Sequence, residues 1–404
     1  MLLLQAFLSW YINFFARLPT LTLFSRLSLS YFFYFSLLGL VSTFLSVFLD
    51  GKGFTSREIG EILAIFTVTK IIAPSLWSML ADKTGQQILI IRVGALLALL
   101  CFSSLFWLST YGTIALALAS FSLFWTAILP QLEVHTLTKL RKNAKIYARV
   151  RLWGSIGFIV LAVITGHAIG YFSNQAFVIL GALMLLALFI CTLALNNNKR
   201  KRVNSESSEL MNVAIWNKII NANFIVFFLA GVLLQMSFAP YYGFFALFLR
   251  ELNYPDFSIG LFVSLGVIAE IVAFIYMGRI FKHCSLKLLL TFSLGATALR
   301  WFLLPLIGAN PYLLAITQLS HAASFAIYHS ASMAFISNHF TQRQQSRGQG
   351  IYVGGVYGIG GATGAYITGI LWLDGAGVHV AFAFAAACAL LGTLIMLRLK
   401  PKMT

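Results

Sequence analysis

The chain has 404 residues, of which 60% are apolar and only 10% are charged. Average soluble domains are about 25% charged, so this composition excludes an ordinary soluble protein and indicates a membrane protein. The formal net charge of +17 would suit a nucleic-acid-binding protein, but the cations lie between apolar stretches, where they act as topology signals. We therefore expect no nucleic-acid partner.

Apolar stretches long enough to cross a hydrocarbon core of about 30 Å recur along nearly the whole chain. In the first half, the predicted spans are 28–49, 57–80, 88–109, 113–134, 150–172 and 175–195. In the second half, they are 222–249, 257–280, 286–307, 311–336, 348–372 and 377–398. Backbone groups in a bilayer must pair internally, so each span is a helix or a barrel strand, and continuous apolar runs exclude the barrel. The predicted fold class is all-α, a polytopic membrane protein with twelve transmembrane helices.

The spans fall into two groups of six, separated by a polar stretch. This is the organisation of a transporter built from two six-helix bundles. We expect an N-terminal bundle at 26–195, a linker at 196–220 and a C-terminal bundle at 221–404. The basic run in the linker is a topology signal or, alternatively, a contact with anionic lipid headgroups.

Residues 1–25 form an apolar segment that is too short to span before Arg17 and Pro19. It lacks the basic start and the small-residue cleavage site of a signal peptide. An interfacial helix and an over-extended start are the two alternatives for this segment.

The lysines and arginines set the orientation of the chain. With both termini in the cytoplasm, nearly all the cations outside the spans lie on the cytoplasmic side, and only Lys52, Arg57 and Arg250 fall on the opposite side. Cytoplasmic loops are enriched in positive charge. We therefore expect a multi-pass protein of the cell inner membrane with a cytoplasmic N-terminus, linker and C-terminus.

Four polar side chains stand well inside the spans, namely Lys70, Glu270, Arg300 and His321. A charge in the middle of a bilayer is costly, so each needs a partner or an aqueous cavity. Glu270 is either a fixed partner of Arg300 or a carboxyl that exchanges a proton, and a pair that breaks during transport would be both. Lys70 lies too deep to reach the interface easily, which favours a cavity-facing cation that binds an anion or a carboxylate.

Helical periodicity groups several polar residues on shared faces. Gln235 and Tyr242 are seven residues apart and lie on one face of their helix. In the predicted span 311–336, one face carries a polar stripe that consists of Gln318, His321, Tyr328 and Ser332. His329 lies outside this stripe. Lipid-facing stripes are apolar, so these faces favour a cavity.

The predicted span 348–372 is rich in glycine at a spacing of four residues. The glycines are Gly350, Gly354, Gly358, Gly360 and Gly364. Small residues at this spacing let helix backbones approach closely, so we expect this span to pack tightly against a neighbour.

No catalytic constellation is present in the sequence. It contains no H-E-x-x-H, G-x-S-x-G or Walker A motif, and its four cysteines form no C-x-x-C spacing. We expect a protein that is not an enzyme, with no metal site and no cofactor. Without a nucleotide-binding segment, transport must be driven by a gradient.

The loop after the second span resembles a signature of the major facilitator superfamily. It reads Ser78-Met-Leu-Ala-Asp-Lys-Thr-Gly-Gln-Gln87, against G-x-L-A-D-R-x-G-R-R in that superfamily. Asp82 and Gly85 match, while the first glycine and the final basic pair are replaced. The resemblance implies that Asp82 and Gly85 belong to a cytoplasmic gate contact.

Further stretches resemble the phenylpropionate permeases, a branch related to lactose permease. They are Arg151-Leu-Trp-Gly-Ser155, Ala239-Pro-Tyr-Tyr-Gly-Phe244, Ser264-Leu-Gly-Val-Ile-Ala-Glu270, Arg300-Trp301 and Gln318-Leu-Ser-His321. The resemblance covers nearly the whole chain from about residue 26 onward.

The similarity to lactose permease implies roles for individual residues. Glu133 and Arg151 match its substrate-contacting glutamate and arginine, and Glu270, Arg300 and His321 match residues of its proton-coupling group. Two positions depart from the pattern, and both bear on the substrate or the proton. Ser324 replaces the proton-carrying glutamate, and Phe158 replaces the tryptophan that stacks on sugar. Lys70 has no counterpart there and favours an anionic substrate.

The resulting prediction is a proton-coupled symporter of a small organic acid, such as an aromatic acid. The rivals are a sugar or nucleoside symporter and, in another class, a membrane sensor or assembly factor that does not transport. We expect protons, a small-molecule substrate and membrane lipids as partners, and a monomer is compatible with the sequence. The candidate substrate-binding residues are Lys70, Glu133, Arg151, Phe158, Gln235, Tyr242 and Tyr328, and the candidate proton-coupling residues are Glu270, Arg300 and His321.

Overall fold

The computed structural model describes residues 22–140, 143–195, 215–342 and 344–400. Within these ranges every regular element is a helix, and 11 helices are long and apolar enough to cross a membrane. The all-α polytopic fold predicted from the sequence is therefore confirmed. The predicted segment 1–25, apart from its last residues, and most of the linker 196–220 lie outside the described residues.

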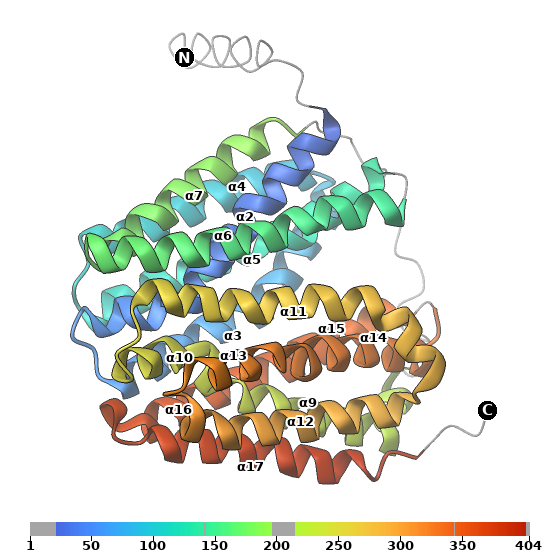
Figure 1. The fold of residues 1–404 in the computed structure, drawn as a ribbon. Helices are drawn as coiled ribbons and strands as arrows, with labels where there is room; N and C mark the ends of the chain where they lie inside the picture. The colour runs from blue at the N-terminus through green and yellow to red at the C-terminus, as the bar shows by residue number, and fades with distance from the viewer. Residues whose placement is uncertain (1–21, 141–142, 196–214, 343, 401–404) are drawn as a thin grey trace.

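The first six predicted spans correspond to six long helices (Figure 1). They are α2 (Leu23–Asp50), α3 (Ser56–Thr84), α4 (Gln87–Ser103), α5 (Tyr111–Lys139), α6 (Ala144–Tyr171) and α7 (Gln175–Leu193). α2 packs along α6, and α4 packs against both α5 and α7. We call this group of six helices the N-terminal bundle.

The second half forms another group of helices, several of which are interrupted. Its elements are α9 (Ala222–Ser237), α10 (Ala239–Glu251), α11 (Asp256–His283), α12 (Leu286–Ile307), α13 (Pro311–Leu319), η2 (Ala322–Ile327), α14 (Tyr328–His339), α15 (Gln345–Tyr352), η3 (Val353–Gly360), α16 (Gly361–Trp372) and α17 (Val378–Met396). α17 packs against α9 and α12. We call these elements the C-terminal bundle.

The predicted span 311–336 is helical but is not one continuous α-helix. α13 ends at Leu319, Ser320 forms a turn, and η2 is π-helical before α14 continues. This interruption explains why 11 single helices qualify as candidate spans among the described residues where the sequence predicted twelve. π-helical turns are rare and occur frequently at functional sites, so the break indicates a candidate functional site in this part of the bundle.

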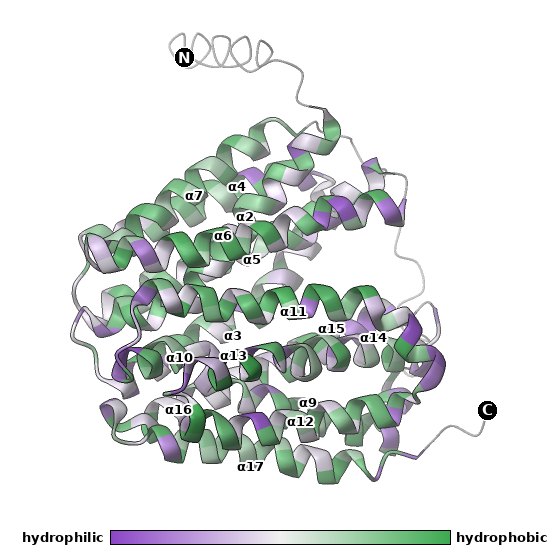
Figure 2. Ribbon diagram, in the orientation of Figure 1, coloured by the Kyte–Doolittle hydropathy of each residue, from purple (hydrophilic) through white to green (hydrophobic). Residues whose placement is uncertain are grey.

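The outer faces of the helices are apolar. Figure 2 shows ribbons that are mostly hydrophobic along their length, with hydrophilic residues concentrated near the helix ends. Ile275, Leu116 and Leu299 are 73%, 68% and 58% exposed. So many large apolar side chains on the surface would be unfavourable in water and are expected where lipid covers the protein.

The helix ends define two opposite ends of the molecule. We call the end that holds the start of α2 and the end of α17 the termini end, and the end that holds residues 51–55, 252–255 and 373–377 the loop end. At the termini end, Arg92 donates hydrogen bonds to the Leu193 and Leu195 carbonyls at 3.1 and 3.0 Å. Basic side chains thus cap open carbonyls at a helix C-terminus, where the helix dipole favours cations.

The two bundles meet closely toward the loop end. A Cβ atom on Gly60 of α3 would lie only 2.6 Å from the Gly369 Cα atom of α16. The backbones of α6 and α11 approach with similar closeness at Gly260, beside the Ala162 carbonyl. In Figure 1, α6 and α11 then diverge toward the termini end.

The glycine-rich span packs as the sequence predicted. A Cβ atom on Gly364 would lie 2.8 Å from backbone atoms of Met236 in α9, and one on Gly360 would meet the Val232 carbonyl at 2.5 Å. Gly358 contacts the Ile71 side chain of α3 across the bundle interface. The glycines therefore serve packing both within the C-terminal bundle and between the bundles.

Candidate functional site

The C-terminal bundle contains a chain of three polar side chains near its centre. The Glu270 carboxylate of α11 lies 2.8 Å from His321 Nε2, and Arg300 of α12 lies 2.7 Å from His321 Nδ1. A guanidinium has only donors, so Nδ1 must be the acceptor, and the ring proton is on Nε2, where it is donated to Glu270. The histidine thus stands between the carboxylate and the guanidinium. The direct Glu270–Arg300 pair considered from the sequence is replaced by this bridge.

Arg300 is buried, and the two terminal nitrogens of its guanidinium have hydrogen-bond partners. It is 2% exposed, donates to the Gln318 side-chain oxygen at 3.2 Å, and lies 4.5 Å from the ring centres of both Tyr241 and Trp301. Tyr241 donates to the same Gln318 oxygen at 2.9 Å. A buried cation requires such hydrogen bonds and ring contacts to offset its lost hydration.

The break in the predicted span 311–336 places His321 in this chain. His321 directly follows the Ser320 turn and directly precedes η2. Its ring stacks on Phe325, which in turn stacks on His329. A π-helical turn takes up more residues than an α-helical turn, so the face that carries His321 continues to His329. Tyr328, which the regular helical wheel placed on that face, is buried with its hydroxyl near Gly231 of α9.

Lys70 is the central polar residue of the N-terminal bundle. It lies near the middle of α3 with its ammonium 4.2 Å from the ring centre of Phe66 and 5.8 Å from that of Trp125. Among the described residues it has no ion-pair partner. The rings supply cation–π attraction, but the ammonium retains capacity to bind an anion.

Arg151 and Glu133 lie in the same bundle, nearer the termini end. The Arg151 guanidinium stacks 3.8 Å from the ring centre of Phe35 in α2. The Tyr147 hydroxyl donates to the Glu133 carboxylate at 3.5 Å. Arg151 and Glu133 influence each other electrostatically without forming an ion pair in the part of the chain that the structure describes.

The remaining candidate residues separate into two groups. The Tyr242 hydroxyl lies 3.4 Å from His321 Nε2, so Tyr242 joins the polar chain. Gln235 does not, because it is buried with its Cβ against Gly360, and α9 ends before α10 begins at Ala239. Phe158 is half-buried in α6, where that helix crosses Gly39 of α2.

The loop motif is partly described. Gly85 ends α3 in the left-handed conformation, with φ of 66°, and its amide donates to the Ala81 carbonyl at 2.8 Å. Glycine adopts this conformation without steric cost, so the motif's glycine ends the helix at the loop. The Asp82 side chain lies outside the described part of the structure.

Sequence and structure comparisons place these features in a known context. The model of the MFS_1-like family matches residues 24–384. The chain belongs to this family. The expected membership of the major facilitator superfamily is thus confirmed, and the chain is a multi-pass membrane transporter of that superfamily.

Three similar proteins have names that state a solute. A probable 3-phenylpropionic acid transporter of Escherichia coli strain K12 is 30% identical over 77% of this chain and 81% of its own length. The maltose permease of Geobacillus stearothermophilus is 23% identical over 92% of this chain and 93% of its own. The crystal structure of the nucleoside transporter NupG, 17% identical, has a TM-score of 0.83 and covers 94% of this chain and 99% of its own. This last likeness establishes the fold only.

Proposed function

We propose that the protein is a proton-coupled symporter that carries a small organic acid by alternating access. The observation that supports this most strongly is Lys70, an ammonium near the middle of a membrane-spanning helix with no anionic partner among the described residues. A charge at this depth has a high cost in free energy, so its presence indicates a function. A substrate carboxylate would supply the missing partner.

The charges of the candidate site favour a monoanion. The N-terminal bundle contributes Lys70, Arg151 and the Glu133 carboxylate, and the C-terminal bundle contributes the Glu270–His321–Arg300 chain. With a neutral histidine, the C-terminal set is balanced and the N-terminal set carries one positive charge in excess. One substrate carboxylate would neutralise that excess.

The rings around the cations favour an aromatic acid. Lys70 lies over Phe66 and Trp125, and Arg151 lies over Phe35. Aromatic walls beside a cation suit a ligand that has a ring and a carboxylate. The relative named as a 3-phenylpropionic acid transporter supports the same substrate class.

Glu270 is the group we assign to the proton. His321 donates to it from Nε2, and Arg300 donates to the opposite nitrogen of that ring, which keeps the histidine a poor proton acceptor. Protonation of Glu270 would turn a charge-assisted hydrogen bond into a weaker neutral one. Proton binding would thereby loosen α11 from the chain and link proton occupancy to movement of the bundles.

A neutral sugar or nucleoside is the second candidate substrate. The similarity to maltose permease and the fold shared with a nucleoside transporter favour it. An unpaired Lys70 has no evident role with a neutral substrate, so the organic acid is preferred.

The cation distribution supports an inner-membrane protein with both termini in the cytoplasm. The termini end would then face the cytoplasm, and the loop end would face the periplasm. Protons and membrane lipids are the further partners of this proposal, and it requires no cofactor or second subunit.

Proton movement on substrate addition tests the proposal. Purified protein in proteoliposomes should take up protons when 3-phenylpropionate is added and should not respond to maltose or uridine. Protein-free liposomes measure passive entry of the protonated acid. A response to maltose or uridine without a response to the acid would contradict the substrate class.

A further inference from the structure

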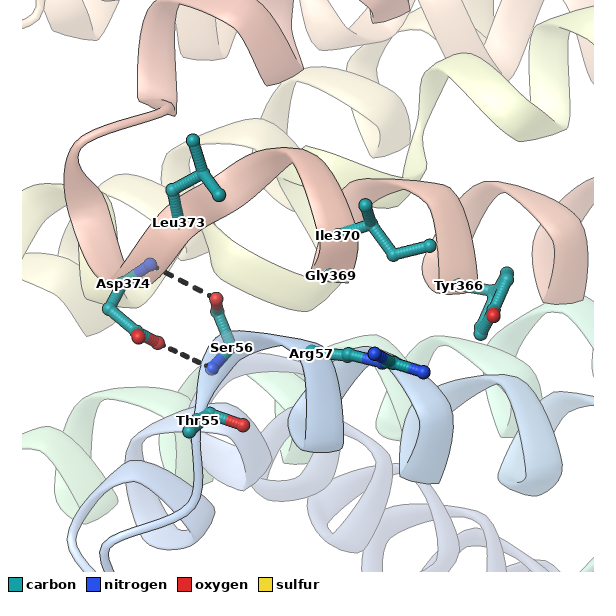
Figure 3. A pocket seen from close by; sticks show the side chains of 8 residues that line it. All are labelled: Thr55, Ser56, Arg57, Tyr366, Gly369, Ile370, Leu373 and Asp374. Atoms are coloured by element: carbon teal, nitrogen blue, oxygen red, sulfur yellow. Dashed lines mark hydrogen bonds between the residues drawn. The ribbon is translucent and has the colours of Figure 1, made fainter.

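A reciprocal pair of hydrogen bonds joins the two bundles at the loop end (Figure 3). The Ser56 amide donates to the Asp374 carboxylate, with 2.6 Å between N and Oδ1, and the Asp374 amide donates to the Ser56 hydroxyl oxygen at 3.0 Å. Ser56 is the first residue of α3, and Asp374 lies in the short turn Leu373–Gly375 after α16. The pair therefore connects the start of one helix to the connection between two helices of the other bundle.

The pair completes the cap of α3. Thr55 accepts from the Glu58 amide and Glu58 accepts from the Thr55 amide, so the local capping box serves two donors. The Ser56 amide lies in the first turn, where no acceptor exists within the helix. Asp374 supplies that acceptor from the opposite bundle and places its negative charge at the positive end of the helix dipole.

The turn that carries Asp374 has a strained backbone. Leu373 and Asp374 have φ values of 50° and 48°, in the left-handed region that residues with a side chain rarely adopt. Leu373 is 63% exposed, so its own packing does not hold the turn. Such strain persists only where the surroundings impose it, and the bond from the Asp374 amide to Ser56 ties the turn to α3.

We propose that Ser56 and Asp374 form a latch that holds the loop end closed, and that the strained turn relaxes when the bundles part. The latch rests on the alternating-access cycle of the proposed function, in which the loop end must open. It lies beside the close approach of Gly60 to Gly369, so both hydrogen bonds must break when α3 leaves α16. A cavity of about 390 Å³ beside the pair, lined in part by Arg57 and Tyr366, admits water to the separated groups.

The Asp374 carboxylate accepts its hydrogen bond from the opposite bundle. Among the described residues it has no ion-pair partner, and the nearby Arg250 is bound by Asp256 at 2.7 Å. Among the described residues, the contact of this carboxylate is therefore the hydrogen bond from the Ser56 amide at the start of α3. Backbone strain in the turn favours the open loop end, whereas the two hydrogen bonds favour the closed one. Because these two contributions oppose each other, the latch can both open and close.

Hydrogen–deuterium exchange of the full-length protein in lipid nanodiscs, without substrate, tests the latch. Asp374→Ala should raise exchange in the peptides covering 56–62 and 366–377 by roughly tenfold, the factor for one charge-assisted hydrogen bond. It should lower exchange at the termini end, in 78–90 and 345–352, because opening one end closes the other. Leu373→Gly relieves strain while keeping the carboxylate, so it should shift both ends in the opposite direction.

Thr55→Ala is the matched control, because it breaks the local cap of α3 and leaves the contact with Asp374. It should raise exchange only in the first turn of α3. If Asp374→Ala also acts only there, with the termini end unchanged, Asp374 is a local cap and the latch is wrong. Unchanged exchange at both ends in Leu373→Gly would contradict the role of strain. This variant also allows the test to be made if Asp374→Ala does not fold. No solute or gradient is used, so these results are independent of the substrate proposal.

Discussion

Arg300 donates a hydrogen bond to Nδ1 of His321, with 2.7 Å between the two nitrogens. This contact fixes the tautomer of the His321 ring. The opposite nitrogen carries the ring proton and points at Glu270, 2.8 Å away. A second proton on the ring would have to sit on Nδ1, against the guanidinium, and for this reason we propose Glu270 rather than His321 as the group that takes up the proton.

Removal of Arg300 should destabilise the protein. Arg300→Ala would leave His321 Nδ1 without a donor, remove one of the two donors to the Gln318 oxygen, and leave Glu270 without a nearby cation, at a position where Arg300 and His321 are buried. Breaking a buried charged network in this way costs roughly 3–5 kcal/mol. Thermal unfolding of the detergent-solubilised protein should show a clear drop in melting temperature. Arg151→Ala, which removes a half-buried guanidinium stacked on a ring, should lower it much less, and equal drops would contradict the assigned role of Arg300.

Neutralising Lys70 should weaken substrate binding more than it weakens folding. Lys70→Met keeps the length and the ring contacts of the side chain but removes its charge. The loss of one charge-assisted contact should reduce affinity for 3-phenylpropionate roughly tenfold, and Arg151→Ala should have a similar effect. Isothermal titration calorimetry would measure both. Lys52→Met is the control, because Lys52 lies at the loop end and donates to the Leu108 carbonyl at 3.2 Å. Normal affinity in both site variants would remove the main support for an acidic substrate.

A side chain at Gly60 should prevent closure of the loop end. The Cβ atom of Gly60→Val would lie 2.6 Å from Gly369 Cα, well inside van der Waals contact, so α3 and α16 would have to separate. We expect substrate binding to persist while the net transport rate in proteoliposomes falls at least tenfold, because one half of the cycle is blocked. Gly170→Val places the same side chain where nothing lies within 4 Å and should transport normally. Wild-type rates in Gly60→Val would show that this crossing does not need to close.

The two ends of the molecule should lie on opposite sides of the membrane. An alkaline phosphatase fusion, active only in the periplasm, should be active at Ser173 in the loop after α6 and inactive at the C-terminus. Enzyme activity in intact cells measures both fusions. Activity at the C-terminus would overturn the proposed orientation.

Much of the fold could be predicted from the sequence, because an apolar run of the length that a bilayer requires predicts each span. The close packing at Gly360 and Gly364 also followed from their spacing. The site was less accessible. Tyr328 was placed beside His321 by a regular helical wheel, and the π-helical stretch between them moves it to a buried position against α9.

The pairing of Glu270 and the bond between the bundles had no sequence signal. Glu270 could have met Arg300 directly, and only the turn at Ser320 brings His321 between them. Ser56 and Asp374 are 318 residues apart, and their contact depends on how the two bundles tilt. Apolar patterning determines which faces are buried but leaves such distant polar contacts undetermined.

The role of Glu270 is tested most directly by uptake of radiolabelled 3-phenylpropionate into proteoliposomes, with uptake into protein-free liposomes subtracted. The initial rate is measured for wild-type protein and Glu270→Gln, once with an inward proton gradient and once as counterflow without a gradient. The glutamine mimics the protonated acid. We predict that the gradient accelerates wild-type uptake, whereas Glu270→Gln retains counterflow and is insensitive to the gradient. Acceleration of Glu270→Gln by the gradient to the wild-type extent would contradict the assignment of the proton to Glu270.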